Sequence, residues 1–332
     1  MSKKPNSGAV LSAWAPAKVN LGLRVLGERP DGYHELLSLM VPVGLWDRLT
    51  VQRRPRGIEL SCPNSELPTG RENLVYRAAE LLLSECRRCE GVRIELTKKI
   101  PVGAGLGGGS SDAAATLVLI NELLDRRLGS RDLHRLAVRV GADVPFFLLG
   151  RAAVVEGIGD RITPLDKFPI FWTLLVNPNF QVSTAWAYQN LTLTTRANGS
   201  TFSSLGKVAG QEAVAYRRRL TGGELSRGDV ISLFANDFEA LVFGHFPQLH
   251  ELRQAVLGAG AEAAVMSGSG PTLVGIFDSE ETTRAAYRLL CQRDGATSFI
   301  ARTLDAAAPR AVRGFDDTGK DTAAHTRTLG RI

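Results

Sequence analysis

Alternating apolar and polar residues mark several strands along this chain. Between residues 17 and 25 every second side chain is apolar, so Lys18 and Asn20 share the opposite, polar face of a predicted strand. Two later apolar runs flank the glycine-rich turn Ser267-Gly-Ser-Gly-Pro271. The strands predicted after the first one cover residues 92–97, 174–176, 262–266 and 272–277.

Other stretches have the spacing of helices. Ala113, Leu117, Ile120 and Leu124 fall on one helical face, with the preceding serines as N-caps and Asp112 in the first turn. A second predicted helix covers residues 133–140 and ends at Gly141, and residues 78–89 are also helix-like. Residues 193–229 are polar and turn-rich. Because helices and strands are interspersed, we expect a mixed α and β fold.

Composition narrows the class of protein. The chain has 332 residues, of which 44% are hydrophobic and 22% charged, which excludes full disorder and suggests about two domains. No apolar run is long enough to span a bilayer, and the N-terminus has no signal-peptide pattern, so we expect a cytoplasmic protein. The four cysteines favour structural roles, since the Cys86–Cys89 pair lies at the end of a predicted helix, and Cys62 and Cys291 stand alone.

The charge of the chain favours small anionic ligands over nucleic acid. Lys and Arg number 40 against 34 Asp and Glu, which gives a formal charge of +6. The basic residues are scattered, and aromatic residues make up only 7% of the chain. A nucleic-acid-binding surface usually gathers its basic residues into a patch and adds aromatic side chains for stacking.

A glycine-rich loop carries the clearest chemical signal. Five glycines lie within residues 103–109, between a strand and the first predicted helix. Glycine allows backbone N–H groups to approach an anion closely, and a helix N-terminus adds unpaired N–H groups and partial positive charge. We therefore expect a phosphate cradle here rather than a linker.

The loop alone does not identify the nucleotide fold. Gly103, Gly105 and Gly108 satisfy G-x-G-x-x-G, but the acidic residue at the spacing of a dinucleotide site, Asp125, falls at the end of the helix instead of on a following strand. A Walker loop lacks its Gly-Lys-Ser/Thr ending, and the signature motifs of protein kinases are absent from the sequence. The pattern indicates nucleotide phosphates and no more.

Three separated segments together resemble the GHMP kinases, a superfamily of small-molecule ATP phosphotransferases. They are Ala-Pro-Ala-Lys-Val-Asn-Leu at 15–21, Pro-Val-Gly-Ala-Gly-Leu-Gly-Gly-Gly-Ser-Ser at 101–111, and Met-Ser-Gly-Ser-Gly-Pro-Thr at 266–272. Residues 29–35, 107–114 and 141–147 further resemble the branch that acts on the cytidine diphosphate derivative of methylerythritol. The resemblance covers residues 13–303, with Arg151 where a glycine is expected.

The resemblance implies an α+β, two-domain GHMP kinase fold. It places a ribosomal-protein-S5-like α/β domain at residues 1–165 and a ferredoxin-like α+β domain at 166–303. Residues 304–332 have almost no large apolar side chain, so we expect a disordered tail there.

The resemblance also assigns the site. Asp143 is the implied catalytic base and Lys18 its cationic partner, although by themselves they would also suit an Asx turn before Pro145 and a solvated surface lysine. Asn20, Tyr33 and His34 are implied to hold the substrate. ATP is implied to lie against Asn73, which could equally cap a helix, and against the loop; the loop residues are Pro101, Val102, Gly103, Ala104, Gly105, Leu106, Gly107, Gly108, Gly109, Ser110 and Ser111.

The implied activity is ATP-dependent phosphorylation of the erythritol 2-hydroxyl of the cytidine diphosphate intermediate in the non-mevalonate isoprenoid route. Mg²⁺ is expected with ATP, and Ser111 is a candidate ligand. The alternatives are a GHMP kinase of the mevalonate or homoserine type, and a non-catalytic nucleotide- or RNA-binding module. We expect no nucleic-acid or membrane partner, and a monomer or weak homodimer.

Overall fold

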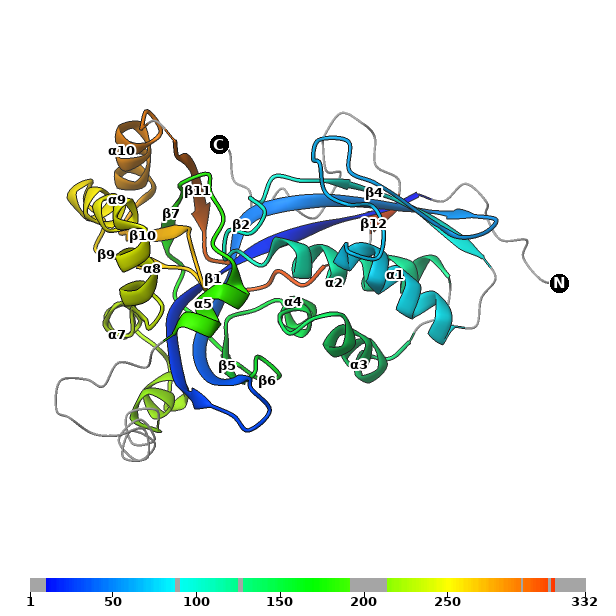
Figure 1. Cartoon of the computed structure of the whole chain (residues 1–332), viewed down its shortest axis with the longest axis horizontal. Helices are drawn as coiled ribbons and strands as arrows, with labels where there is room; N and C mark the ends of the chain where they lie inside the picture. The colour runs from blue at the N-terminus through cyan, green and yellow to red at the C-terminus, as the bar shows by residue number, and fades with distance from the viewer. Residues whose placement is uncertain are drawn as a thin grey trace.

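The computed structural model describes residues 10–86, 90–124, 128–191, 214–293, 295–309 and 312–313. Figure 1 shows two halves, each with a sheet covered by helices, and two long strands that extend across both. Among the described residues no helix is long and apolar enough to cross a membrane. The predicted mixed α and β class is therefore the observed one, and most of the turn-rich stretch at 193–229 lies outside the described residues.

The first sheet is built on the long antiparallel pair β1 (Val10–Glu28) and β2 (His34–Arg54). The strand predicted at 17–25 is thus the middle of a much longer one, because its polar positions are covered by other parts of the chain. The remaining members of this sheet are β3 (Ile58–Ser61), β4 (Gly91–Thr97), β5 (Ala153–Gly157), β6 (Arg161–Pro164), β8 (Ala235–Asn236) and β12 (Val312–Arg313).

Four helices lie beneath this sheet in Figure 1, and their apolar sides share one core with it. They are α1 (Leu74–Glu85), α2 (Gly108–Leu123), α3 (Ser130–Val140) and α4 (Val144–Leu149). Helix α2 begins before the predicted serine caps, with Gly107 in a left-handed conformation as its N-cap. The serines therefore lie inside the first turn, which brings the helix N-terminus directly onto the glycine loop.

The second sheet has the strand order β11-β7-β10-β9 and is antiparallel throughout. In chain order this is strand 4-1-3-2 of a βαββαβ unit, the ferredoxin-like arrangement that the family resemblance implied. Its strands are β7 (Trp172–Asn177), β9 (Ala263–Met266), β10 (Leu273–Phe277) and β11 (Thr297–Arg302). The helices of this half are α5 (Thr184–Asn190), α7 (Arg227–Ser232), α8 (Glu239–His245), α9 (Pro247–Gly258) and α10 (Glu280–Leu290).

Segments from the later part of the chain pack against elements of the first half. Strand β8 pairs with β1, and β12 pairs with the beginning of β1. The prediction of a disordered tail from residue 304 is wrong for its first part: the Leu304 amide donates to the carbonyl of Pro42, and the Ala307 amide to that of Gly150. Ala307 is buried, so an alanine supplies the packing that the lack of large side chains concealed. Residues 314–332 lie outside the described part of the chain.

Candidate active site

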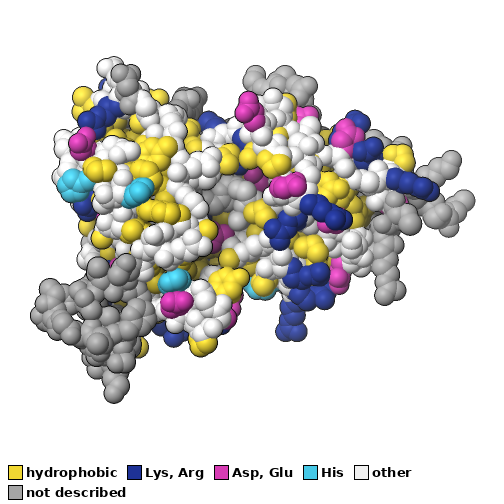
Figure 2. All heavy atoms as spheres, viewed as in Figure 1, with side chains coloured by type: hydrophobic (Ala, Val, Ile, Leu, Met, Phe, Trp, Pro, Cys, Tyr) yellow, Lys and Arg dark blue, Asp and Glu magenta, His cyan; other side chains and the backbone are white. Residues whose placement is uncertain are grey.

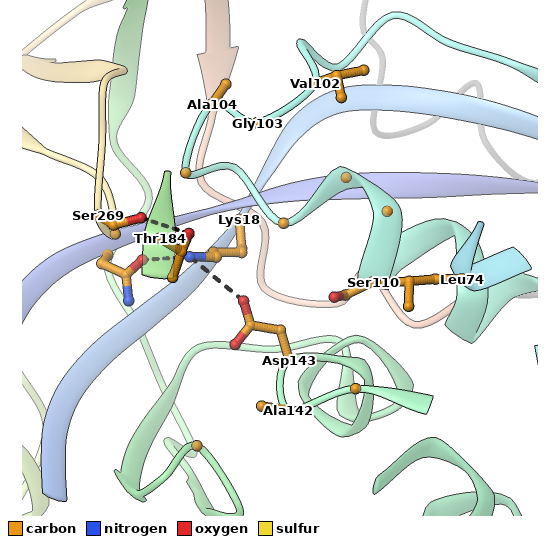
Figure 3. Close-up of a pocket in the computed structure, with 18 of the residues that line it drawn as sticks. Lys18, Leu74, Val102, Gly103, Ala104, Ser110, Ala142, Asp143, Thr184 and Ser269 are labelled. Carbon is orange, nitrogen blue, oxygen red and sulfur yellow. Dashed lines mark hydrogen bonds and ion pairs between the residues drawn. The ribbon is translucent and has the colours of Figure 1, made fainter. Parts of the chain in front are cut away.

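A cavity of about 990 Å³ lies between the glycine loop, the middle of β1 and β2, and the helix α5. It brings together residues from distant parts of the chain, as Figure 3 shows. The predicted site residues that line it are Lys18, Asn20, Tyr33, His34, Asn73, Pro101, Val102, Gly103, Ala104, Gly105, Gly107, Gly108, Gly109, Ser110 and Asp143. Leu106 and Ser111 are the two that do not, because both side chains are buried beneath the loop.

Three glycines of the loop have conformations or contacts that exclude a side chain. Gly103, Gly105 and Gly107 all have positive φ. A Cβ on Gly107 would lie 2.9 Å from Cγ of Lys18 and from Cζ of Phe147, and one on Gly105 would collide with the carbonyl of Ser267. The loop is therefore packed against the lysine strand and the third motif, and its glycines are needed for close approach as well as for backbone shape.

Lys18 and Asp143 meet at the floor of the cavity. Lys18 Nζ lies 3.8 Å from Oδ2 of Asp143, and Figure 3 shows the two side chains pointing at each other. The lysine side chain is 6% exposed and the carboxylate 36%. Burial lowers the pKa of Lys18, while the negative charge of Asp143 opposes this lowering.

The carboxylate of Asp143 is not used to cap a helix. It stands at the N-cap position of α4, but its side chain makes no capping hydrogen bond. The Asx-turn alternative therefore has no hydrogen bond to support it, and the carboxylate faces Lys18 and the cavity. Lys18 is likewise buried rather than solvated, which removes the surface alternative.

The third motif closes over these residues. Ser267 Oγ accepts a hydrogen bond from the backbone amide of Asn20 at 3.1 Å and donates one to the Gly105 carbonyl at 2.9 Å. One side chain thus links all three motifs. The next residues of this loop, Gly268 and Ser269, line the cavity, and Ser269 Oγ lies 2.9 Å from Thr184 Oγ1 of α5.

Three aromatic side chains, Tyr33, His34 and Tyr188, also line the cavity. Tyr33 is 61% exposed, and the His34 ring lies 5.2 Å from the ring of Tyr188. Burial, with the nearby charge of Asp143, raises the pKa of Tyr188 to about 12, so its hydroxyl stays protonated at neutral pH. Sequence reasoning missed Tyr188, since α5 is too short for a periodic signal.

A second buried lysine lies under the N-terminus of α2. Lys98 Nζ contacts carboxylates of Asp47 and of Asp112, the latter at 2.8 Å. Burial raises the pKa of Asp112 to about 8, against the lowering effect of Lys98, and the two carboxylates keep the pKa of Lys98 high. These residues were also missed, since nothing in the spacing of Asp47, Lys98 and Asp112 shows that they meet.

The cavity is not basic. Its described lining contains the two lysines Lys18 and Lys98 and the three carboxylates Glu72, Asp112 and Asp143. On the face that Figure 2 shows, Lys and Arg side chains lie in several places, the largest group in the right half, with acidic side chains nearby. The excess positive charge is therefore not gathered here, and phosphate groups would depend on backbone N–H groups and counter-ions.

Asn73 both caps a helix and lines the cavity, which are the two roles that the sequence analysis left open. Its Oδ1 accepts a hydrogen bond from the Val75 amide at 2.9 Å, so it caps helix α1. It also lines the cavity, across from the first turn of α2. Among the described residues no group of three or more His, Cys, Asp or Glu side chains is placed to hold a metal ion, and Ser111 Oγ is buried with no hydrogen-bond partner there.

A glycine cradle at a helix start, joined to a lysine–aspartate pair, defines a small-molecule phosphotransferase. Two family matches agree with it: GHMP kinases N terminal domain at residues 73–151 and GHMP kinases C terminal at residues 223–294. Homoserine kinase from Cytophaga hutchinsonii has a similar fold, with a TM-score of 0.69 at 20% identity over 94% of this chain and 99% of that one.

Closer relatives narrow the family. A 4-diphosphocytidyl-2-C-methyl-D-erythritol kinase from Citrifermentans bemidjiense is 43% identical over 89% of this chain and 99% of its own length. One from Geobacter metallireducens is 43% identical over 83% and 92%. The crystal structure of a 4-(cytidine 5'-diphospho)-2C-methyl-D-erythritol kinase matches with a TM-score of 0.70 and 37% identity, over 88% of this chain and 98% of that one. The chain belongs to the GHMP kinases, and within them to the 4-diphosphocytidyl-2-C-methyl-D-erythritol kinases.

Proposed function

We propose that this chain transfers the γ-phosphoryl group of ATP to the 2-hydroxyl of 4-diphosphocytidyl-2-C-methyl-D-erythritol, a step of the non-mevalonate isoprenoid pathway. The observation that carries the proposal is the Lys18–Asp143 pair, which lines the same cavity as the phosphate loop and as Tyr33, His34 and Tyr188. An acceptor hydroxyl at the pair can thus belong to a molecule whose other end is an aromatic base.

Asp143 is the proposed proton acceptor. As the substrate oxygen forms its bond to the γ-phosphorus, the hydroxyl proton passes to the carboxylate, and the bond from that phosphorus to the bridging oxygen breaks to release ADP. Lys18 pairs with Asp143 and stabilises negative charge on the transferring group. Asn20 holds Lys18 Nζ through its Oδ1 at 2.5 Å.

The loop residues 101–111 and Asn73 are proposed to bind ATP. The first backbone N–H groups of α2 have no carbonyl partner within the helix, and this N-terminus lies at the glycine loop, which suits the β- and γ-phosphates. Tyr33, His34 and Asn20 are proposed to hold the cytidine substrate. The His34 ring packs against Tyr188, whose own ring lies 4.9 Å from that of Phe238. The base would therefore contact an aromatic wall formed by Tyr33, His34 and Tyr188.

We also propose Mg²⁺ as the counter-ion of ATP. The cavity lining has more carboxylates than lysines, so it cannot neutralise a triphosphate by side chains alone. Ser111, the candidate ligand from the sequence, is buried and does not line the cavity, so phosphate oxygens and water would supply the ligands of the ion. When bound, the ion neutralises the charge of the β- and γ-oxygens. We further propose an enzyme of the cytoplasm that acts as a monomer or weak homodimer.

The proposal is tested by measuring ADP release with 4-diphosphocytidyl-2-C-methyl-D-erythritol, mevalonate and homoserine side by side. We expect turnover with the cytidine substrate and at least about a hundredfold lower kcat/KM with the other two, because they lack the base that the aromatic wall would bind. Preference for mevalonate or homoserine would identify another GHMP kinase. Nucleotide binding without ADP release on any of the three would favour a binding module instead.

A further inference from the structure

A bulge in β1 lies directly beside the catalytic pair. Asn20 pairs with Met40 of β2, but the next paired residue of β1 is Gly22, which faces Leu39, so Leu21 is the extra residue. Bulges re-aim neighbouring side chains and leave backbone groups out of the regular ladder. Here the irregularity separates the strand segment that carries Lys18 and Asn20 from the segment that continues toward α5.

The hydroxyl of Ser38 spans this bulge. Ser38 lies on β2 and is 3% exposed. Its Oγ donates to the Gly22 carbonyl at 2.8 Å and accepts from Nδ2 of Asn20 at 2.7 Å. A serine hydroxyl has one hydrogen. Because that hydrogen is used on Gly22, the oxygen can only accept from Asn20.

The direction of the Asn20–Ser38 hydrogen bond determines how the side-chain amide of Asn20 is oriented. With Nδ2 turned to Ser38, Oδ1 faces Lys18 and accepts from Nζ at 2.5 Å. The reversed amide would set an NH₂ group against the ammonium of Lys18, two donors facing each other at a site that is 5% exposed. Burial penalises such an unpaired arrangement heavily, since water cannot enter to relieve it.

We propose that Ser38 is a positioning residue for phosphoryl transfer: its hydroxyl, held by the Gly22 carbonyl in the bulge, orients the Asn20 amide and thereby keeps the Lys18 ammonium directed at Asp143. Ser38 acts through Asn20. The proposal rests on the proposed function only for its kinetic readout.

The orientation of Asn20 also affects the protonation of Lys18. Burial already lowers the pKa of Lys18, and Asp143 opposes that effect. An amide oxygen on Nζ further favours the ammonium form. Tyr188, the other titratable group near Asp143, stays neutral in the working range because its pKa is about 12. Loss of the Ser38 hydroxyl is therefore expected to lower the pKa of Lys18, and activity that needs the ammonium would be lost at a lower pH.

The test compares Ser38→Ala, Ser38→Thr and the control Thr173→Val. Thr173 is also a buried hydroxyl, which donates to the Ala301 carbonyl at 3.0 Å in the second sheet, outside the cavity lining. We expect Ser38→Ala to lower kcat about tenfold, with KM for ATP nearly unchanged, and to move the alkaline limb of the kcat profile to lower pH. Ser38→Thr keeps the hydroxyl and should restore most of both, whereas Thr173→Val should lower the melting temperature only.

Two results would overturn the proposal: wild-type kcat and pH profile in Ser38→Ala, or a folded Ser38→Thr as impaired as Ser38→Ala. A second measurement needs no substrate. Lysine ¹³Cε resonances, with Lys18 assigned through Lys18→Arg, give the pKa of Lys18 in the wild type and in Ser38→Ala. An unchanged pKa counts against the role of Ser38 even if the chain phosphorylates none of the three alcohols, a result that would refute only the proposed function.

Discussion

The burial of Lys18 depends on a segment that is distant in the sequence. Alternation placed it correctly on the polar side of a strand, beside Asn20, but that side is not solvated. Its backbone amide donates to the Leu106 carbonyl, so the glycine loop crosses directly over the strand. A local pattern identifies which face a side chain takes, but the loop that covers the face comes from a distant part of the sequence.

Removal of either member of the pair should stop turnover without unfolding the protein. For Lys18→Ala and Asp143→Asn we expect kcat to fall at least about a hundredfold, since each variant removes charge that acts on the transferring group. Circular dichroism and thermal melting should show a native fold for both. Near-wild-type turnover in either folded variant would remove that residue from the mechanism.

The residues missed at this scale have a common physical reason. Tyr188 reaches the cavity from helix α5, Ser38 from strand β2 and Lys98 from the segment after β4, and none of these has a distinctive pattern. Their roles come from contacts across the fold, such as the 5.2 Å approach of the His34 and Tyr188 rings. The glycine loop was found from its own composition, whereas Lys18 and Asp143 were assigned through the resemblance to the GHMP kinases.

At the scale of elements, a short segment after α7, residues 235–239 (here called the strap), bonds both to β1, which carries Lys18, and to the third motif. Asn236 Nδ2 donates to the carbonyls of Met266 and Gly268, at 2.6 and 2.7 Å. Asp237 accepts from the Val25 amide, and Glu239 from the Met266 amide. The strap makes the position of the third motif depend on a two-residue strand that no periodicity could predict.

Asn236→Ala should therefore weaken catalysis from outside the reacting atoms. It leaves two loop carbonyls without their donor, and we expect kcat/KM to fall about tenfold because Gly268 and Ser269 line the cavity. Asn121→Ala is the matched control: Asn121 also bonds backbone groups, both on Leu128, but lies outside the cavity lining. Equal losses of kcat/KM in the two variants would mean a general loss of stability.

Helices and strands with strong patterns were predictable, and their ends were not. The hairpin around Ser267–Pro271 and the C-terminal end of α3 at Gly141 agree with the sequence analysis. The start of α2 was predicted too late because serine is a good N-cap, whereas the structure uses Gly107, which the contact with Lys18 requires. Tertiary contact decided that boundary against local propensity.

At the scale of the whole molecule, β1 and β2 belong to both halves. Residues early in β1 pack with α1 to α4, while Leu23 and Val25 join the core of the second half. The boundary proposed at residues 165 and 166 therefore separates neither the two sheets nor two independent cores, because β8 and β12 come after it and belong to the first sheet. Composition and length indicated the number of halves correctly and could not show that β8 and β12 return to the first sheet.

The contact between α4 and the late chain is testable by Gly150→Ala. Gly150 has a φ of 65° at the end of α4, and a Cβ there would collide with the backbone of Ala308. Strain of about 2 kcal/mol or more predicts a melting temperature lower by about 5 °C. Gly129→Ala, at a position with negative φ and open space, should leave it within about 1 °C. An unchanged Gly150→Ala melting temperature would mean that the late segment does not pack there.

The return of late strands to β1 has a consequence for biosynthesis. The strand that carries Lys18 is made early, yet its neighbours at residues 235–236, 267 and 312–313 are made much later. An emerging chain must therefore keep an apolar strand unsatisfied through most of translation. Premature termination before the third motif would give a product with both catalytic side chains but no assembled site, exposed to proteases and dependent on chaperones.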